Sequence, residues 1–271
     1  MAPFRMYGKT IYALNDWIRD EFRPVFGIPG AFEKVVGAAF IQAKKDGVKI
    51  LEMSLDAGFS DAFGISPEKI MDTFRLGHQT IAPEIDFRPE LGFARSRNTD
   101  YLMRCLEAFL DLGYFRSIDL YDDEFAQPPS AFVKIFRKAK SHGLRCKAHA
   151  GEFGSAASVK ETAEILELDA IQHGISAAKE DKVMQWLADQ QIPLNVCPAS
   201  NIRLRRAGSY ATHPIRRLFD AGVIVTINTD DVVIFGNGVS EQYYKLYRSG
   251  AFTLAELERI RIYGLQGALK N

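Results

Sequence analysis

Three short strings in this chain combine residue types that can do chemistry: His149-Ala-Gly-Glu152, His173-Gly174 and Asn228-Thr229-Asp230-Asp231. Each string follows a short apolar run rich in β-branched residues, which is typical of a β-strand. Imidazole and carboxylate groups at successive strand ends suit metal-assisted hydrolysis, because both groups ligate zinc. The five histidines form no His-x-His pair, which such a constellation normally needs to hold its metal.

Each residue of these strings also has an ordinary structural interpretation. His149 and His173 could be hydrogen-bonded histidines at a strand end or turn, and Glu152 could cap the helix that follows it, because carboxylates favour helix N-termini. The pair Asp230-Asp231 could be a solvated turn. Its place directly after the apolar run Val223–Ile227 favours a site, because adjacent carboxylates repel unless a cation or donors lie nearby. We therefore interpret the strings as parts of one site.

The other polar candidates carry a weaker signal. His78, His142 and His213 lie in or beside expected helices and are predicted to be structural. Cys197 has no paired base in the sequence and is predicted to be a buried thiol. The string Tyr121-Asp122-Asp123-Glu124 also follows a predicted strand, so it is either a solvated loop or one border of the pocket.

Composition excludes several functional classes. The 271 residues suffice for one large α/β barrel or two modest domains. Lys+Arg and Asp+Glu balance at 34 each, so there is no electrostatic footprint for nucleic acid. Three cysteines are too few and too scattered for a disulfide framework. No membrane span or secretory signal is expected, and we predict a cytoplasmic protein.

Strand-like and helix-like segments alternate along the chain. The strands are predicted at Val48–Ser54, Ile81–Arg88, Phe115–Tyr121, Leu144–His149, Ala170–Gln172, Pro193–Val196 and Val223–Asn228. The helices are predicted at Ile11–Phe22, Phe32–Asp46, Pro67–Thr80, Asn98–Leu112, Ser130–His142, Ser155–Leu166, Lys179–Gln190, Pro214–Ala221, Ser240–Ser249 and Leu254–Leu265. Ser66 and Thr253 are predicted N-caps, and Glu256 completes a capping box with Thr253.

This alternation predicts an α/β fold with parallel strands. No Gly-rich nucleotide-binding turn follows a strand, and polar residues gather after several strands, as they do in barrel active sites. We predict a (β/α)8 TIM-type barrel that lacks its first strand, because seven strands are expected and Phe4–Tyr7 is too short to count as one. Residues 1–30 are predicted to be an N-terminal helical extension, and 31–271 a single amidohydrolase-type barrel domain.

With these strings in this order, the chain resembles a known family, adenosine deaminase and its relatives among the metal-dependent amidohydrolases. The resemblance covers roughly residues 35–265, in the family's order. The matching residues are Ile118-Asp119-Leu120, His149-Ala-Gly-Glu152, Gln172-His173-Gly174, Cys197-Pro198 with Ser200, and Thr226-Ile227-Asn228-Thr229-Asp230-Asp231.

The resemblance implies a zinc ion and a set of roles. His149 and Asp230 would be metal ligands, and Asp230 would also belong to the catalytic group. Glu152 would protonate the purine ring nitrogen, and His173 would orient the attacking water and stabilise developing charge. Because the family's His-x-His pair is missing, the two remaining ligands would hold zinc weakly or not at all.

For the substrate, the resemblance implies that Asp231 hydrogen-bonds the purine's imidazole edge and that Gly151 lets the substrate approach the backbone. The chain departs from the family after Ile118-Asp119-Leu120, where a small residue and a glycine are usual. Here Tyr121 and Asp122 follow, and we expect Asp122 to border the substrate and alter the pocket. Val232 stands where the family usually has proline.

Two functions remain open on the sequence. The first is an adenosine deaminase-like hydrolase that replaces an amino group on a purine or related ring, with its missing ligands supplied by a segment upstream of Met1. The second is a truncated or non-catalytic homologue that acts as a ligand-binding or interaction protein. A small aminated purine or nucleoside is the expected partner, and self-association is plausible if strand edges are exposed.

Overall fold

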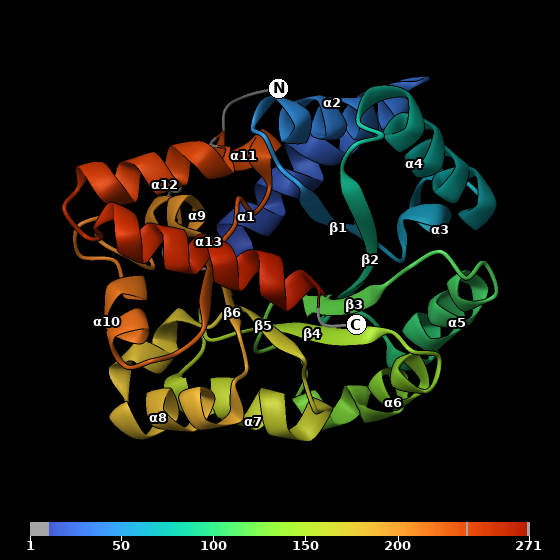
Figure 1. Ribbon diagram of the computed structural model, residues 1–271. Helices are drawn as coiled ribbons and strands as arrows, with labels where there is room; N and C mark the ends of the chain where they lie inside the picture. The colour runs from blue at the N-terminus through green and yellow to red at the C-terminus, as the bar shows by residue number, and fades with distance from the viewer. Residues whose placement is uncertain (1–10, 237, 270–271) are drawn as a thin grey trace. The chain divides into compact units, whose positions relative to one another are not determined.

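The computed structural model describes residues 11–236 and 238–269. This part of the chain divides into two compact units, which we call unit 1 (residues 11–146) and unit 2 (residues 147–236 and 238–269). Helices and strands alternate in both (Figure 1). Phe4–Tyr7, the segment considered as a first strand, lies outside the described residues. Among the described residues, no single helix is long and apolar enough to cross a membrane, and only the bent pair 11–27 and Ala31–Lys45 meets that test jointly.

Unit 1 is built on three parallel strands, with β1 paired to β2 and β2 to β3. Its strands are β1 (Ile50–Asp56), β2 (Asp86–Ala94) and β3 (Ser117–Tyr121), and its helices are α1 (Ile11–Trp17), a π-helix (Ile18–Phe22), a 3-10 helix (Arg23–Gly27), α2 (Ala31–Lys45), α3 (Phe59–Phe63), α4 (Pro67–Ile81), α5 (Thr99–Leu110), a 3-10 helix (Pro129–Phe132) and α6 (Val133–Ser141). Leu91 lies opposite both Leu55 and Ile118 in the register, and all three are buried. The strands therefore share one apolar layer.

Helices α2 and α4 pack against each other in unit 1. On α2, Phe32, Val36 and Phe40 recur at helical spacing and are buried. On α4, a Cβ atom at Gly77 would lie 3.2 Å from the Phe40 ring, so the glycine permits the close approach. The Ser66 hydroxyl accepts a hydrogen bond from the backbone N–H of Lys69, which confirms the predicted cap of α4.

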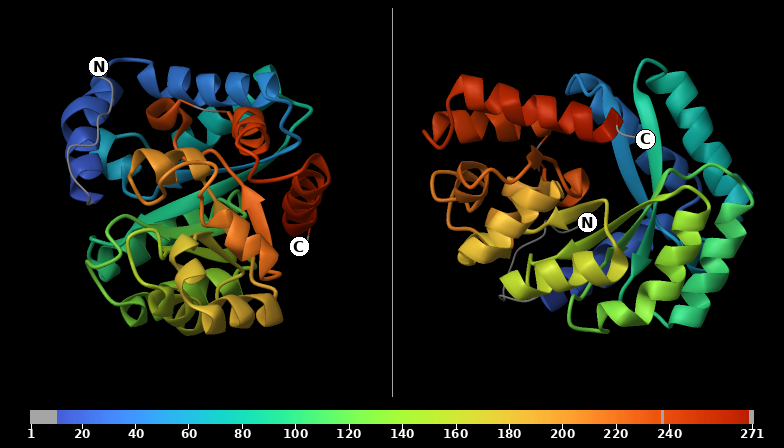
Figure 2. Two further views of the ribbon diagram at one scale, coloured as in Figure 1. Left: turned by 90° about the vertical axis from the view of Figure 1, so that its left-hand side faces the viewer. Right: turned by 60° about the horizontal axis from the view of Figure 1, so that its bottom comes forward.

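Unit 2 contains the four strand segments β4 to β7, paired in parallel in chain order. The strands are β4 (Arg145–Ala150, beginning at the end of unit 1), β5 (Ala170–His173), β6 (Leu194–Val196) and β7 (Val225–Ile227), and the helices are α7 (Ala156–Leu166), a 3-10 helix (Ile175–Lys179), α8 (Asp181–Gln190), α9 (Pro198–Arg203), α10 (Ile215–Asp220), α11 (Val232–Phe235), α12 (Val239–Arg248) and α13 (Leu254–Leu269). Helix α13 runs beside β7, as Figure 2 shows. The described residues thus hold seven strands, one fewer than a complete (β/α)8 barrel has.

Two helix starts in unit 2 bear on the predictions. Ser155 caps α7 by accepting from the backbone N–H of Ser158, so this cap is a serine hydroxyl and not the Glu152 carboxylate. At α13, the Glu256 carboxylate accepts from the backbone N–H of Thr253, and Thr253 Oγ1 accepts from the N–H of Glu256. This reciprocal pair confirms the predicted capping box.

Candidate active site

The backbone turns left-handed after three strand segments of unit 2, at the predicted site residues. Gly151 follows β4 with φ +70°, His173 ends β5 with φ +62°, and Asp230 lies beyond β7 with φ +58°. A positive φ is uncommon for residues other than glycine, and such strain persists where the surrounding structure demands it, often at functional sites. Of the four other described non-glycine residues with a positive φ, Glu167 and Gln191 are the C-caps of helices α7 and α8.

Packing explains why glycine occupies position 151. A Cβ atom there would lie 2.2 Å from Cγ2 of Val159, so helix α7 can approach β4 only if this residue has no side chain. The Gly151 carbonyl accepts a hydrogen bond of 2.9 Å from the backbone N–H of Ser176. Gly151 is therefore required by local structure, and its predicted contact with a substrate stays a prediction.

A polar ladder fixes the register of β5, β6 and β7. Gln172, Asn195 and Thr226 are register partners, and their side chains bond in sequence at 2.9 Å. Asn228 adds a bond from its amide to Thr226 Oγ1 at 2.8 Å. Because a one-residue slip would break both bonds between the strands, the ladder holds the residues that follow these strands in fixed positions.

Gln242, a buried residue of α12, connects two loops at the candidate site. Its Oε1 accepts from the backbone N–H of Ala199 at the start of α9, at 3.0 Å. Its Nε2 donates to the carbonyl of Asn228, just before Asp230, at 2.6 Å. Helix α9 and the segment after β7 are thus tied to the same side chain.

Four side chains from these elements come together: Glu152, His173, Asn201 and Asp230. Asn201 Nδ2 donates to Glu152 Oε1 and lies within hydrogen-bond distance of His173 Nδ1, at 3.1 Å in both cases. Glu152 Oε1 is 3.5 Å from His173 Nδ1, and His173 Nε2 is 3.9 Å from Asp230 Oδ2. The exposed fraction is 2% for His173 and 0% for Asn201, and the Asp230 side chain keeps 20%. The structure therefore gathers the three predicted catalytic residues in one group, in which the Asn201 amide contacts Glu152 and His173 and Asp230 lies beside His173.

Burial sets the charge state of the central imidazole. Desolvation lowers the pKa of His173 well below its usual value, and the imidazoles of His149 and His213 act in the same direction. The ring is consequently neutral at pH 7. Desolvation, and then the Asp230 carboxylate, raises the pKa of Asp231, although Asp231 remains accessible to solvent. Asp231 is exposed, so a small molecule can reach its carboxylate.

The predicted metal ligands lie beside this group. The rings of His149 and His173 are 5.0 Å apart between centroids, and Asp230 is the nearby carboxylate. Ligand-type atoms of His173, Cys197 and Asp230 all lie within 4.8 Å of one another. Of the two predicted ligands, this group contains Asp230 but not His149. Imidazole and carboxylate donors fit a zinc ion in type, although the two predicted ligands are fewer than the three of a usual catalytic site.

The remaining predicted residues lie elsewhere or have structural contacts. Asp122 belongs to unit 1, where its carboxylate accepts from Asn15 at 2.7 Å and from Ser96. His78 contacts the Ile85 carbonyl at 2.7 Å, and His142 ends α6. His213 is buried, and its Nδ1 accepts from the N–H of Ile215 at 3.1 Å.

The predicted burial of Cys197 is confirmed, but the sequence predicted neither its closeness to the site nor any role for Asn201. Cys197 is buried, and its pKa is raised by desolvation and then by the carboxylates of Asp230 and Glu152, so the thiol lies close to the site. Both residues belong to the segment directly after β6, and short helix α9 was not predicted. The available signals were the strand end and the matching string Cys197-Pro198 with Ser200, which ends one residue before Asn201.

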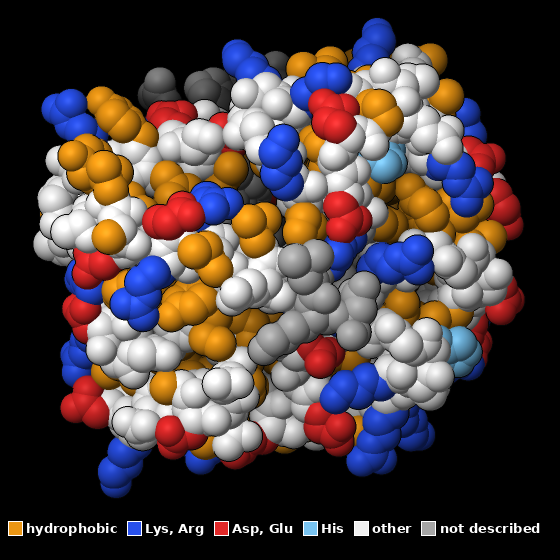
Figure 3. Space-filling model, viewed as in Figure 1, with side chains coloured by type: hydrophobic (Ala, Val, Ile, Leu, Met, Phe, Trp, Pro, Cys, Tyr) orange, Lys and Arg blue, Asp and Glu red, His pale blue; other side chains and the backbone are white. Residues whose placement is uncertain are grey.

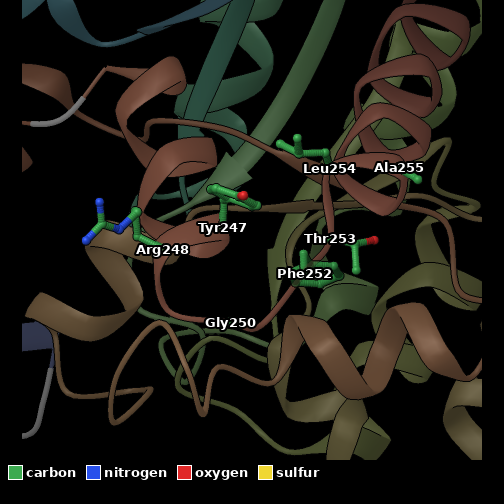
Figure 4. A pocket seen from close by; sticks show the side chains of 7 residues that line it. All are labelled: Tyr247, Arg248, Gly250, Phe252, Thr253, Leu254 and Ala255. Atoms are coloured by element: carbon green, nitrogen blue, oxygen red, sulfur yellow. The ribbon is translucent and has the colours of Figure 1, made fainter.

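A cavity of about 880 Å³ lies where α12 joins α13, and it is lined by Tyr247, Arg248, Gly250, Phe252, Thr253, Leu254 and Ala255 (Figure 4). None of the predicted site residues lines it. On the face shown in Figure 3, acidic and basic side chains are interspersed, in line with the balanced charge of the sequence. Neither feature competes with the buried cluster as a catalytic site.

Comparison with known proteins decides the family to which the chain belongs. The adenosine deaminase family model matches residues 14–271. The chain belongs to the adenosine deaminase family. A Treponema pallidum protein assigned as an adenosine/adenine deaminase is 34% identical over 215 residues, which are 79% of this chain and 72% of that protein. Against other curated bacterial adenine deaminases, the chain spans 54–65% of their length.

Solved structures give the same result for the fold. An adenine deaminase from Arthrobacter aurescens superposes with a TM-score of 0.87 at 25% identity and covers 96% of this chain and 80% of its own. A zinc-bound amidohydrolase from Burkholderia ambifaria superposes at 0.85 with 22% identity, over 99% and 76%. The predicted TIM-type barrel lacking one strand is confirmed. The comparisons support a purine deaminase-like hydrolase and do not favour a non-catalytic homologue.

Proposed function

We propose that this adenosine deaminase family member hydrolyses the exocyclic amino group of an aminated purine, releasing ammonia and leaving an oxo group on the ring. The observation that carries this proposal is the convergence of Glu152, His173 and Asp230 in one buried group of unit 2. The related deaminases from Treponema and Arthrobacter support the purine as the class of substrate.

Each side chain has a task that its position permits. Glu152, buried and adjacent to the imidazole, donates a proton to the purine ring nitrogen beside the carbon that loses its amino group. His173 is neutral, faces Asp230 through Nε2 and orients the attacking water. Asp231, which is exposed to solvent, accepts a hydrogen bond from the imidazole edge of the purine. The backbone of Gly151 contacts the purine ring.

His149 and Asp230 both lie beside His173 and would hold a zinc ion in this site, as their donor types permit. When bound, zinc supplies a hydroxide nucleophile at neutral pH by lowering the pKa of its water. The zinc-bound amidohydrolase among the structural neighbours favours this metal. These two ligands alone would hold the zinc ion weakly. A substrate-binding role for Asp122 is proposed on the sequence alone.

The test is an ammonia-release assay on the chain after addition of zinc, with adenine, adenosine and AMP as substrates. Metal analysis gives the zinc content of the same sample. We expect ammonia release from at least one of these purines, dependent on zinc and proportional to its occupancy. No ammonia from any of them at full zinc occupancy, together with measurable purine binding, would overturn the enzyme and favour a binding protein.

A further inference from the structure

Asn201 has the position of a shared hydrogen-bond donor at the centre of the site. It is fully buried on α9, and it reaches side chains that come from the segments of β4 and β5. Its Nδ2 atom lies 3.1 Å from Glu152 Oε1 and 3.1 Å from His173 Nδ1. An amide nitrogen has two N–H bonds, so one group serves both acceptors.

The protons must be arranged in one of two ways. If Nδ2 faces the two residues, neither Glu152 Oε1 nor His173 Nδ1 carries a proton. If the amide is reversed, its oxygen requires a proton on both of them at once. With Nδ2 facing them, Asn201 Oδ1 is a buried atom that finds no partner among the described residues, which costs free energy that the two donated bonds must offset.

We propose that Asn201 is a positioning residue that fixes the tautomer of His173 and the acid geometry of Glu152. Because an N–H of Asn201 donates to His173 Nδ1, that nitrogen carries no proton. The single ring proton of neutral His173 therefore lies on Nε2, which is 3.9 Å from Asp230 Oδ2. His173 then works as a hydrogen-bond donor toward the nucleophile and does not act as a base. This inference rests on the proposed function for its catalytic meaning, but the tautomer itself does not.

The same amide determines which oxygen of Glu152 carries the acid proton. A protonated carboxyl group accepts at its carbonyl oxygen and donates from its hydroxyl oxygen. Because Oε1 accepts from Asn201, the transferable proton belongs on Oε2. In the reaction this proton moves from Oε2 to the purine ring nitrogen, and Glu152 is left as a carboxylate that Asn201 continues to hold.

The direct test is nitrogen NMR of the imidazole rings in the ¹⁵N-labelled chain at pH 7.5, with and without zinc. Only five histidines are present, and a His173→Gln sample identifies the resonances of position 173. We expect Nδ1 of His173 to resonate as an unprotonated nitrogen and Nε2 as a protonated one. A proton on Nδ1 would overturn the proposal, because it requires the reversed amide.

Two variants extend the test. Asn201→Asp is nearly isosteric but replaces the donor by an acceptor, so the ring proton of His173 should move to Nδ1. Where ammonia release is measurable, we expect kcat to fall by about 10- to 100-fold, as for other lost hydrogen-bond partners of site residues, with KM changed far less. Asn195→Asp makes the same exchange in the β5–β7 ladder, and it should leave the His173 tautomer unchanged.

The outcomes separate the two proposals. The expected tautomer without ammonia release from any purine would keep the role of Asn201 and overturn the enzyme. Ammonia release with a proton on Nδ1 would keep the enzyme and overturn the role of Asn201. An identical tautomer in Asn201→Asp and in the unaltered chain would also overturn it, because another group would then set the proton.

Discussion

The strand ends of unit 1 and unit 2 carry similar polar residues, but they use them differently. In unit 1, the acidic residues after β3 are bound by nearby donors: Asp122 accepts from Asn15 and Ser96, and Asp123 accepts from Tyr12 at 3.1 Å. In unit 2, Glu152, His173 and Asp230 gather around one another, with Asn201 donating to two of them. The hydrogen bonds in unit 1 hold the loop after β3 in place, whereas the group in unit 2 brings potentially catalytic side chains together.

Backbone strain alone does not distinguish the two regions. Asp122 has φ +81°, and His173 and Asp230 have +62° and +58°. What differs is the set of neighbours. The hydrogen bonds to Asp122 and Asp123 come partly from helix α1, whereas the group in unit 2 combines acid and imidazole side chains from several strand ends. A strained polar residue after a parallel strand therefore indicates a site only when its partners are themselves reactive groups.

The largest expected effect comes from removing the acid of unit 2. Glu152→Gln keeps the shape and the bond from Asn201 but cannot deliver a proton, so kcat should fall by about 10²- to 10⁴-fold. Zinc content should stay the same, because Glu152 is not a predicted ligand. Ammonia release and metal analysis on the same sample check both points.

The matched control for that variant lies in unit 1. Glu90 is also buried and accepts from Ser117 Oγ at 2.7 Å. Glu90→Gln should lower the free energy of unfolding, because it removes a buried charge that accepts a hydrogen bond, and it should leave kcat unchanged. Equal losses of activity in the two variants would remove the distinction between the units.

The second effect concerns the left-handed glycine of the site. Gly151→Ala adds a Cβ atom 2.2 Å from Val159 to a residue with φ +70°, so strain and overpacking together should cost about 2–5 kcal/mol. Gly143 in unit 1 has φ +77° but nothing within 4 Å of such a Cβ atom, and Gly143→Ala should cost only about 1 kcal/mol. Urea denaturation of both variants gives the two values. Similar losses would show that Val159 moves aside.

Periodicity predicted most elements of both units, and the errors have identifiable causes. The second strand was expected at Ile81–Arg88, but Ile81 ends α4 and β2 runs over Asp86–Ala94. The observed strand includes Pro89, whose nitrogen has no N–H to donate to a neighbouring strand. Its carbonyl nevertheless accepts from Arg116 at 2.9 Å, so pairing continues through it.

The candidate site was predictable only where its residues are titratable. Histidine and carboxylate strings after apolar runs identified positions 149, 152, 173 and 230, because their residue types are those of zinc chemistry. Asn201 depends on α9, a helix of six residues with no hydrophobic periodicity to detect. Its role follows from two distances that no pattern in the chain encodes.

A third effect appears only in acid. Burial lowers the pKa of His213 to about 4, below the usual value of 6.5. The unfolded chain therefore binds a proton between pH 6.5 and 4 that the folded protein rejects, so stability falls as pH falls through this window and is constant above it. At pH 4 the loss from this one group should be about 3 kcal/mol.

His213→Asn tests that prediction, because its amide oxygen can still accept from the N–H of Ile215. Urea denaturation from pH 7.5 to pH 4 should show a smaller loss of stability in the variant than in the unaltered chain. Parallel profiles would mean that His213 takes up its proton without cost. The buried His213 imidazole would then not be an acid-sensitive part of unit 2.

The smallest effect tests the fastened loop of unit 1. Asn15→Ala removes the 2.7 Å bond to Asp122 and should lower the free energy of unfolding by about 1 kcal/mol, because the carboxylate keeps its bond from Ser96. Urea denaturation measures this loss. Unchanged stability would contradict a role of this bond in holding the loop.

Ser96→Ala removes the other bond to Asp122. A KM for the purine that stays constant in both variants would argue against Asp122 as a substrate contact. A KM that rises in both variants at constant kcat would instead indicate that the loop after β3 contributes to purine binding. The two units would then differ only in the acid chemistry of Glu152.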